Sequence, residues 1–203
     1  MKTFVVKGNL CFSRSMDELA LMEHSYIVVE DGRAAGVFRT LPGRYTQLPV
    51  LDYGDRLILP GMTDLHVHAP QFAFRGLGMD MELLEWLNTY TFPEEAKYKE
   101  LDYAERAYGS FVNHLLHSTT TRAAIFATIH VPATKLLMRK LDEAGLSCYV
   151  GKVNMNRNSP VYLREISTNQ ALRDTESWLC ETKEAYRNVK PILTPRFIPS
   201  CTD

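Results

Sequence analysis

The sequence predicts an α/β fold: the first half of a (β/α)8 TIM-like barrel, preceded by a small N-terminal β-sandwich segment. Residues 1–56 contain short β-type segments separated by turns, whereas from Leu57 apolar strands alternate with amphipathic helices. From Leu57 onward 147 residues remain, and an eight-unit barrel typically needs about 250. We therefore expect about four βα units in residues 57–203 and interpret the sequence as a fragment of a longer protein.

The N-terminal segment, residues 1–56, is expected to form part of a composite β-sandwich. Its predicted strands are Lys2 to Lys7, Ser25 to Glu30 and Arg33 to Arg39. Asp31-Gly32, between two apolar stretches, favours a tight hairpin turn. The charged residues here have no metal-ligand or catalytic-triad spacing, so we interpret the segment as packing material.

Residues 57–203 show the alternation that is typical of a parallel sheet with helical crossovers. The predicted strands are Leu57 to His66, Thr121 to Ala127, Cys148 to Met155 and Val189 to Thr194. The predicted helices are Met81 to Thr91, Asp102 to His117, Val131 to Ala144 and Asn169 to Tyr186. A half-built sheet would expose an unpaired edge, so we expect such a fragment to associate or to be poorly soluble.

Composition and charge exclude several classes of protein. The net charge is −1 with acidic and basic residues interspersed, which argues against a nucleic-acid partner. No apolar run approaches the length of a membrane span. The four cysteines are irregularly spaced without a Cys-x-x-Cys motif, which indicates free thiols and a cytoplasmic location. The cytidine-type deaminase signature is also missing from the sequence.

Two histidines, His66 and His68, stand two residues apart at the end of the first apolar strand. Side chains at i and i+2 of a strand point to the same face, so both imidazoles can reach one metal ion. The carboxyl ends of the strands carry the functional groups of βα barrels. We therefore predict a metal site, with a hydrogen-bonded structural pair as the alternative.

Four further residues are candidates for ligand binding because of their side-chain chemistry and position. Gln71 offers both a donor and an acceptor, so it can pair with a ligand edge that itself presents both. Arg196 supplies rigid donors suited to a carbonyl, and Phe197 presents a flat face for stacking. Trp86 belongs to an apolar helical stripe and is a candidate pocket wall. Residue type alone leaves other interpretations open. Gln71 could be a solvated loop residue, and Arg196 could form a surface salt bridge next to Phe197 as a ring of the core.

The remaining four histidines are interpreted as structural or solvated because they lack metal-ligand partners at suitable spacing. They are His24, His114, His117 and His130.

The segment Pro60-Gly61-Met62-Thr63-Asp64-Leu65-His66-Val67-His68 resembles the first metal-binding strand of the amidohydrolase superfamily. Four further segments resemble the guanine-deaminating branch of that superfamily, so that the similarity runs from about Leu57 to the last residue. They are Ala69-Pro70-Gln71, Leu83-Leu84-Glu85-Trp86-Leu87, Tyr90-Thr91-Phe92-Pro93 and Thr194-Pro195-Arg196-Phe197.

This resemblance implies one zinc ion per subunit, held in part by His66 and His68, with guanine contacted by Gln71, Arg196 and Phe197. It also implies two further histidines, a metal-binding aspartate and a proton-shuttling glutamate beyond Asp203. No catalytic residue is then expected within these 203 residues. The family further suggests a homodimer.

The predicted function is zinc-dependent hydrolysis of guanine to xanthine and ammonia in purine catabolism, carried out by the full-length protein. The 203-residue chain alone is expected to be inactive. One alternative is another amidohydrolase, a deaminase or chlorohydrolase acting on a different purine, a pterin or a triazine. The other is a non-catalytic fragment that folds only with a partner or not at all.

Overall fold

A computed structural model describes residues 3–202 of the chain, which divides after Pro60 into two compact units. The boundary expected after residue 56 lies within strand β4 (Val50–Ile58). Each unit is described by itself.

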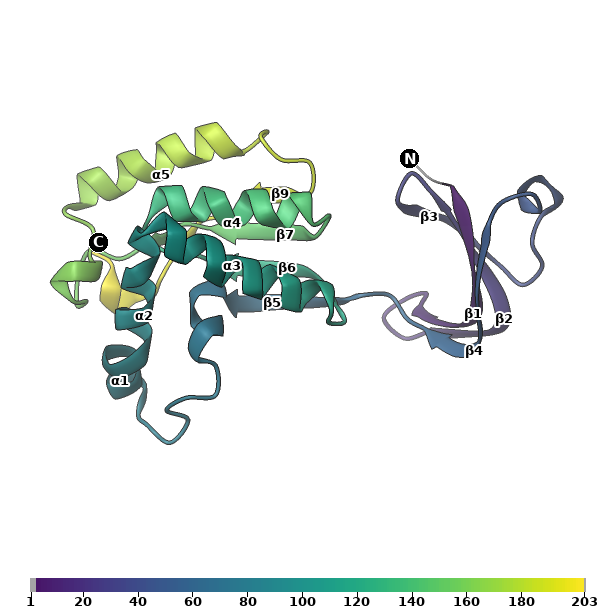
Figure 1. The fold of residues 1–203 in the computed structure, drawn as a ribbon, viewed down its shortest axis with the longest axis horizontal. Coiled ribbons are helices and arrows are strands. Elements are labelled where there is room, and N and C mark those ends of the chain that lie inside the picture. Colours follow the sequence, from purple (N-terminus) through teal and green to yellow (C-terminus); the bar gives the residue numbers. More distant parts are fainter. Residues whose placement is uncertain (1–2, 203) are drawn as a thin grey trace. The chain divides into compact units, whose positions relative to one another are not determined.

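The first unit contains one four-stranded sheet in the order β3-β2-β1-β4 (Figure 1). Its other strands are β1 (Phe4–Ser13), β2 (Leu19–Glu30) and β3 (Arg33–Phe38). β2 runs antiparallel to β1 and β3, whereas β4 is parallel to β1. The predicted hairpin is confirmed: Asp31 and Gly32 link β2 to β3 with φ angles of 51° and 77°, as a tight primed turn requires. The composite sandwich stays a prediction.

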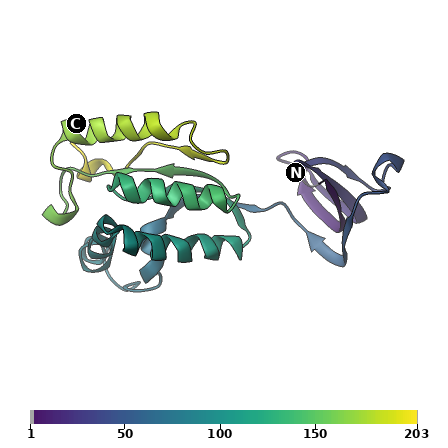
Figure 2. The same cartoon turned by 45° about the horizontal axis from the view of Figure 1, so that its top comes forward.

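The second unit contains a parallel sheet in the order β5-β6-β7-β9, as predicted for an α/β protein. The strands are β5 (Met62–His68), β6 (Thr120–Phe126), β7 (Ser147–Gly151) and β9 (Val189–Pro191). The crossovers contain α3 (Leu101–Leu116), α4 (Val131–Glu143) and α5 (Thr168–Thr182), which lie on one side of the sheet (Figures 1 and 2).

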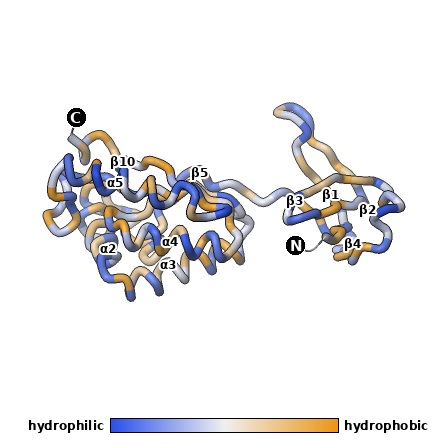
Figure 3. The backbone as a smooth tube through the Cα atoms, turned by 90° about the horizontal axis from the view of Figure 1, so that it is seen from above, coloured by the Kyte–Doolittle hydropathy of each residue, from blue (hydrophilic) through white to orange (hydrophobic). Residues whose placement is uncertain are grey.

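A continuous apolar core joins these helices to the sheet. Buried positions recur every three or four residues along α3 and α4, which places one apolar face of each helix on the strands. The alternation of apolar and polar positions is visible along both helices in Figure 3. Ile125 of β6, Val150 of β7, and Leu137 and Leu141 of α4 are all fully buried members of this core.

The single strand predicted over Leu57 to His66 is wrong. Leu57 and Ile58 belong to β4, and β5 begins at Met62. Pro60 between them has no N–H for a sheet ladder. Gly61 lies so close to Thr121 that a Cβ on residue 61 would be 2.1 Å from Thr121 Oγ1.

Two other predicted strands are each split in the structure. The segment predicted as Cys148 to Met155 forms β7 and the separate β8 (Val153–Asn154), which pairs with β10 (Thr194–Pro195) in a small parallel sheet. The segment Val189 to Thr194 likewise forms β9 and the beginning of β10. Pro191 ends β9 because proline cannot continue a ladder as a donor.

The helix predicted over Met81 to Thr91 is also irregular. It consists of α1 (Leu83–Trp86), a π-helical turn (Leu87–Thr91) and α2 (Phe92–Ala96). Pro93 is the second residue of α2, just after the π-helical turn, and because proline has no N–H to bond back into the preceding turn, the regular helical hydrogen-bond pattern is interrupted here. The last predicted helix ends at Thr182, four residues before Tyr186.

Candidate active site

The structure brings His66 and His68 together at the carboxyl end of β5. Their ring centroids are 5.1 Å apart, with the ring planes inclined by 64°. Both rings contact Phe126 at the end of β6, at 5.0 Å and 4.6 Å respectively. The backbone N–H of His66 donates a 3.1 Å hydrogen bond to Asp64 Oδ1. The two imidazoles therefore lie on one side of the sheet, at the end where a parallel barrel carries its functional groups.

The environment of His68 suits a metal ligand. Its Nδ1 is buried without a hydrogen-bond partner. Burial is the main cause that lowers the pKa of His68 to about 3, and the positive charges of Arg196 and His66 act in the same direction. Neutral imidazole is the form that binds a metal ion, so this site keeps a lone pair available at neutral pH.

Two histidines do not complete a metal site. Among residues 3–202 there is no group of three or more His, Cys, Asp or Glu side chains placed to hold a metal ion. Catalytic zinc usually has three protein ligands and an open position. His66 and His68 thus fit zinc as part of a larger ligand set.

An open pocket of about 690 Å³ lies against the two histidines. Six of its lining residues are the ones selected from the sequence: His66, His68, Gln71, Trp86, Arg196 and Phe197. Apolar and aromatic side chains complete most of the wall, including Phe72, Leu83, Leu87 and Phe111. A largely apolar pocket with a few polar groups is typical of a small-molecule site.

Short elements after β5 place two of these side chains. Gln71 lies in a 3-10 helix (Ala69–Phe74) that begins directly after His68. Trp86 is the last residue of α1, and its Nε1 donates a 3.0 Å hydrogen bond to the carbonyl oxygen of Leu77. Phe74 packs beside the indole with ring centroids 5.6 Å apart. These contacts fix Trp86 as one wall of the pocket.

Arg196 is held by a buried partner that the sequence analysis missed. Arg196 Nη1 donates to Glu95 Oε2 at 2.5 Å, and the two side chains are 4% and 2% exposed. The guanidinium also lies 5.4 Å from the ring centroid of Phe92. Arg196 thus forms an ion pair, as the alternative of a surface salt bridge expected, but the pair is buried and does not lie on the surface. The pair is 101 residues apart in sequence, and no local pattern marks it.

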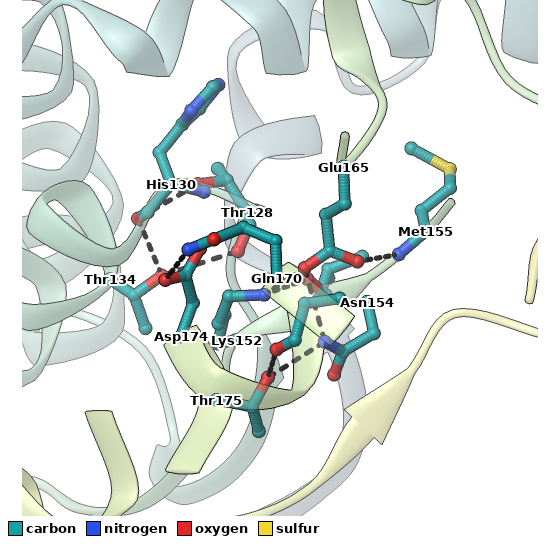
Figure 4. A network of polar contacts seen from close by, with 12 residues as sticks. Thr128, His130, Thr134, Lys152, Asn154, Met155, Glu165, Gln170, Asp174 and Thr175 are labelled. Carbon is teal, nitrogen blue, oxygen red and sulfur yellow. Dashed lines mark hydrogen bonds and ion pairs between the residues drawn. The ribbon is translucent and has the colours of Figure 1, made fainter. Parts of the chain in front are cut away.

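A second buried polar network surrounds β8, the strand that pairs with β10 just before Arg196 (Figure 4). Lys152 forms an ion pair with Glu165, whose Oε2 accepts a 2.8 Å hydrogen bond from the backbone N–H of Met155. Asn154 Nδ2 donates to Thr175 Oγ1 of α5 at 2.8 Å. The carbonyl oxygen of Asn154 accepts a 3.1 Å bond from the backbone N–H of Arg196. The network therefore holds β8 in place and, through the bond to Asn154, the backbone at Arg196.

The four remaining histidines do not line this pocket. His24 is exposed, His114 contacts Phe72, His117 Nδ1 bonds the carbonyl oxygen of Asn113, and the backbone N–H of His130 donates to Thr128 Oγ1. Burial lowers the pKa of His130.

The fold and the histidine pair agree with comparison to known proteins. The model of the amidohydrolase family matches residues 57–203. The chain belongs to the amidohydrolase family.

Guanine deaminases are among its homologues. Guanine deaminase of Dictyostelium discoideum is 42% identical over 218 residues, covering 97% of this chain and 48% of the relative. Guanine deaminase of Mus musculus is 42% identical over 146 residues, covering 71% of this chain and 32% of the relative. The crystal structure of guanine deaminase from C. acetobutylicum, with guanine bound in its active site, superposes with a TM-score of 0.94 at 47% identity. That match covers 99% of this chain and 48% of the other.

The matches thus cover between about a third and about half of the length of these relatives. None of the helices in residues 3–202 is long and apolar enough to cross a membrane.

Proposed function

We propose that the full-length protein is a zinc-dependent guanine deaminase, which hydrolyses guanine to xanthine and ammonia. The observation that carries the proposal is the convergence of His66 and His68 with Gln71, Arg196 and Phe197 on one pocket. The similarity to guanine deaminases over nearly the whole chain supports it.

His66 and His68 would hold the zinc ion, one per subunit. The unpartnered Nδ1 of His68 and the neutral state of its ring fit that role. When bound, zinc would supply Lewis acidity, which lowers the pKa of a water molecule toward neutrality. The further ligands and the proton-shuttling glutamate belong, in this proposal, to the part of the full-length protein outside these residues.

Gln71, Arg196 and Phe197 would bind and orient the base. A guanidinium donates hydrogen bonds to a carbonyl oxygen such as O6 of guanine, and a phenyl ring stacks on a flat heterocycle. Phe197 is 37% exposed, which leaves part of its ring open for such contact. Trp86 would close one wall of the pocket and exclude water from the base.

The remaining features of the full-length protein are proposed by the same reasoning. The four parallel strands would form half of a (β/α)8 barrel, and the N-terminal sheet would join a composite β-sandwich. The protein would act in the cytoplasm as a homodimer, without a nucleic-acid or membrane partner.

A substrate panel with the full-length protein tests this proposal. Guanine, adenine, a pterin and a chlorotriazine are compared by ammonia or chloride release, with and without zinc. We expect guanine to have the highest kcat/KM by at least about tenfold. A different ring would leave polar groups of the pocket without hydrogen-bond partners, which weakens binding of the transition state. Preference for another ring would favour one of the alternative amidohydrolase activities.

A further inference from the structure

The buried carboxylate of Glu95 faces two polar residues of the pocket. Glu95 is buried and lies on α2, whereas Gln71 follows β5 and Arg196 follows β10. Arg196 Nη1 donates to Glu95 Oε2, and Glu95 Oε1 is buried without a hydrogen-bond partner. Burial raises the pKa of Glu95, while Arg196 and the nearby amide of Gln71 act to lower it. The carboxylate form is favoured by the permanent charge of Arg196.

An ionised carboxylate can accept hydrogen bonds but cannot donate them. Any polar group that approaches Glu95 favourably must therefore point a hydrogen-bond donor at it, and for Arg196 and Gln71 that donor is an N–H. For Arg196 this is the observed Nη1 contact. For Gln71 it would be the Nε2 amide group, because Glu95 Oε1 has no other hydrogen-bond partner and Gln71 is among the groups that act against the burial-raised pKa of Glu95.

The orientation of Gln71 toward Glu95 determines which hydrogen-bonding atom Gln71 presents to a ligand in the pocket. If Gln71 directs its NH2 at Glu95, its carbonyl Oε1 is left for the pocket that both Gln71 and Arg196 line. Arg196 keeps further N–H donors. The pocket then presents an acceptor and a donor together, which complements a ring bearing an N–H next to a C=O.

We propose that Glu95 is a positioning residue that sets the hydrogen-bond polarity of Gln71 and Arg196, and so selects lactam bases such as 6-oxopurines. This inference rests on the proposed function for the identity of the ligand. It adds a residue that does not line the pocket itself. It predicts that the pocket prefers a ring with an N–H next to a C=O over a ring with the opposite donor and acceptor pattern.

The test compares guanine with 2-aminopurine, which keeps the amino group on C2 but lacks the lactam N–H and C=O. Zinc-free full-length protein is titrated with fluorescent 2-aminopurine, and guanine is then measured by displacement. The unmutated protein should bind guanine at least about tenfold more tightly. Glu95→Gln should reduce this preference about tenfold, because Gln71 is then free to turn over.

Three variants separate positioning from general stability. Glu95→Asp keeps an acceptor-only partner and should retain the preference. Glu94→Gln is the matched control on the same helix, since Glu94 pairs with Lys97 and Tyr103 instead of Arg196. Gln71→Met leaves the Glu95–Arg196 pair intact and should reduce the preference for guanine over 2-aminopurine. This variant keeps the test valid even if Glu95→Gln does not fold.

The possible outcomes distinguish this inference from the proposed function. An unchanged preference in Glu95→Gln or Gln71→Met, or equal weakening of both ligands, would overturn the role of Glu95. If the unmutated protein turns over guanine with zinc, the proposed function stands even then. A preference that depends on Glu95 without any guanine turnover would support the inference and refute the proposed function.

Discussion

The imidazole of His68 stacks on the phenyl ring of Phe126, with ring centroids 4.6 Å apart and planes inclined by 16°. The two residues are direct partners in the pairing of β5 with β6, so the contact is set by the register of the sheet. Because Phe126 also contacts His66, one aromatic side chain orients both proposed zinc ligands.

Replacing Phe126 with Ala should therefore loosen both imidazoles. We expect the zinc affinity of the full-length protein to fall about tenfold, in the range seen when groups that orient metal ligands are removed. Competition with a chromogenic chelator measures this affinity. Phe38→Ala, which removes an aromatic ring that pairs with Tyr45 in the N-terminal sheet unit, is the control and should leave zinc binding unchanged. Equal loss in both variants would contradict the role of Phe126.

Arg196→Ala should impair guanine turnover while zinc stays near the unmutated level. The loss is expected to be about 10- to 100-fold in kcat/KM, because a buried polar partner left unpaired costs about 1–3 kcal/mol. Glu95 would lose its ion-pair partner as well, so the free energy of unfolding should also decrease. Metal analysis of the purified variant, alongside kinetics, checks the assignment. Stoichiometric loss of zinc would instead make Arg196 part of the metal site.

Sequence periodicity was sufficient for the parallel sheet, its covering helices and the proximity of His66 to His68. Each rests on a local rule: period two in strands, period 3.6 in helices, and functional groups at strand ends. Gln71 and Arg196 could be selected by residue type and position, but their common neighbour could not. Glu95 lies next to Glu94 on a short helix, so the sequence alone indicates a solvent-exposed charge. Its burial depends on Arg196, a partner 101 residues away. The strand predicted over Leu57 to His66 was carried across Pro60-Gly61 because the apolar run continues on both sides of that break.

Close packing at Gly151 gives a matched pair of glycine variants. A Cβ on residue 151 would lie 2.1 Å from Thr194 Oγ1 and 2.6 Å from its Cβ, so β10 would have to shift. We expect Gly151→Ala to lower the free energy of unfolding by about 1–3 kcal/mol. Gly109→Ala in α3, where the nearest atom is Lys140 Nζ at 3.8 Å, should raise it by about 0.5–1 kcal/mol. Urea denaturation of the full-length protein measures both, and a harmless Gly151→Ala would refute the predicted contact.

A polypeptide of these 203 residues alone should show no guanine turnover, even with added zinc. The residues described include no group of three or more potential metal ligands. A zinc ion held by two histidines would be weakly bound, and missing acid–base assistance commonly costs about 100- to 10,000-fold in rate. Ammonia release by freshly purified polypeptide, free of host enzyme, decides this. Zinc-dependent release that disappears in His66→Ala would show the prediction to be wrong.

The most direct test of the central claim is to measure zinc content and guanine turnover together in full-length protein with and without His66→Ala. The unmutated protein should contain one zinc per subunit and convert guanine to xanthine and ammonia, with activity lost on chelation and restored by zinc. His66→Ala should lose both bound zinc and turnover, since a protein ligand of the ion is removed. Full guanine turnover in His66→Ala, or in the chelated protein, would contradict the account.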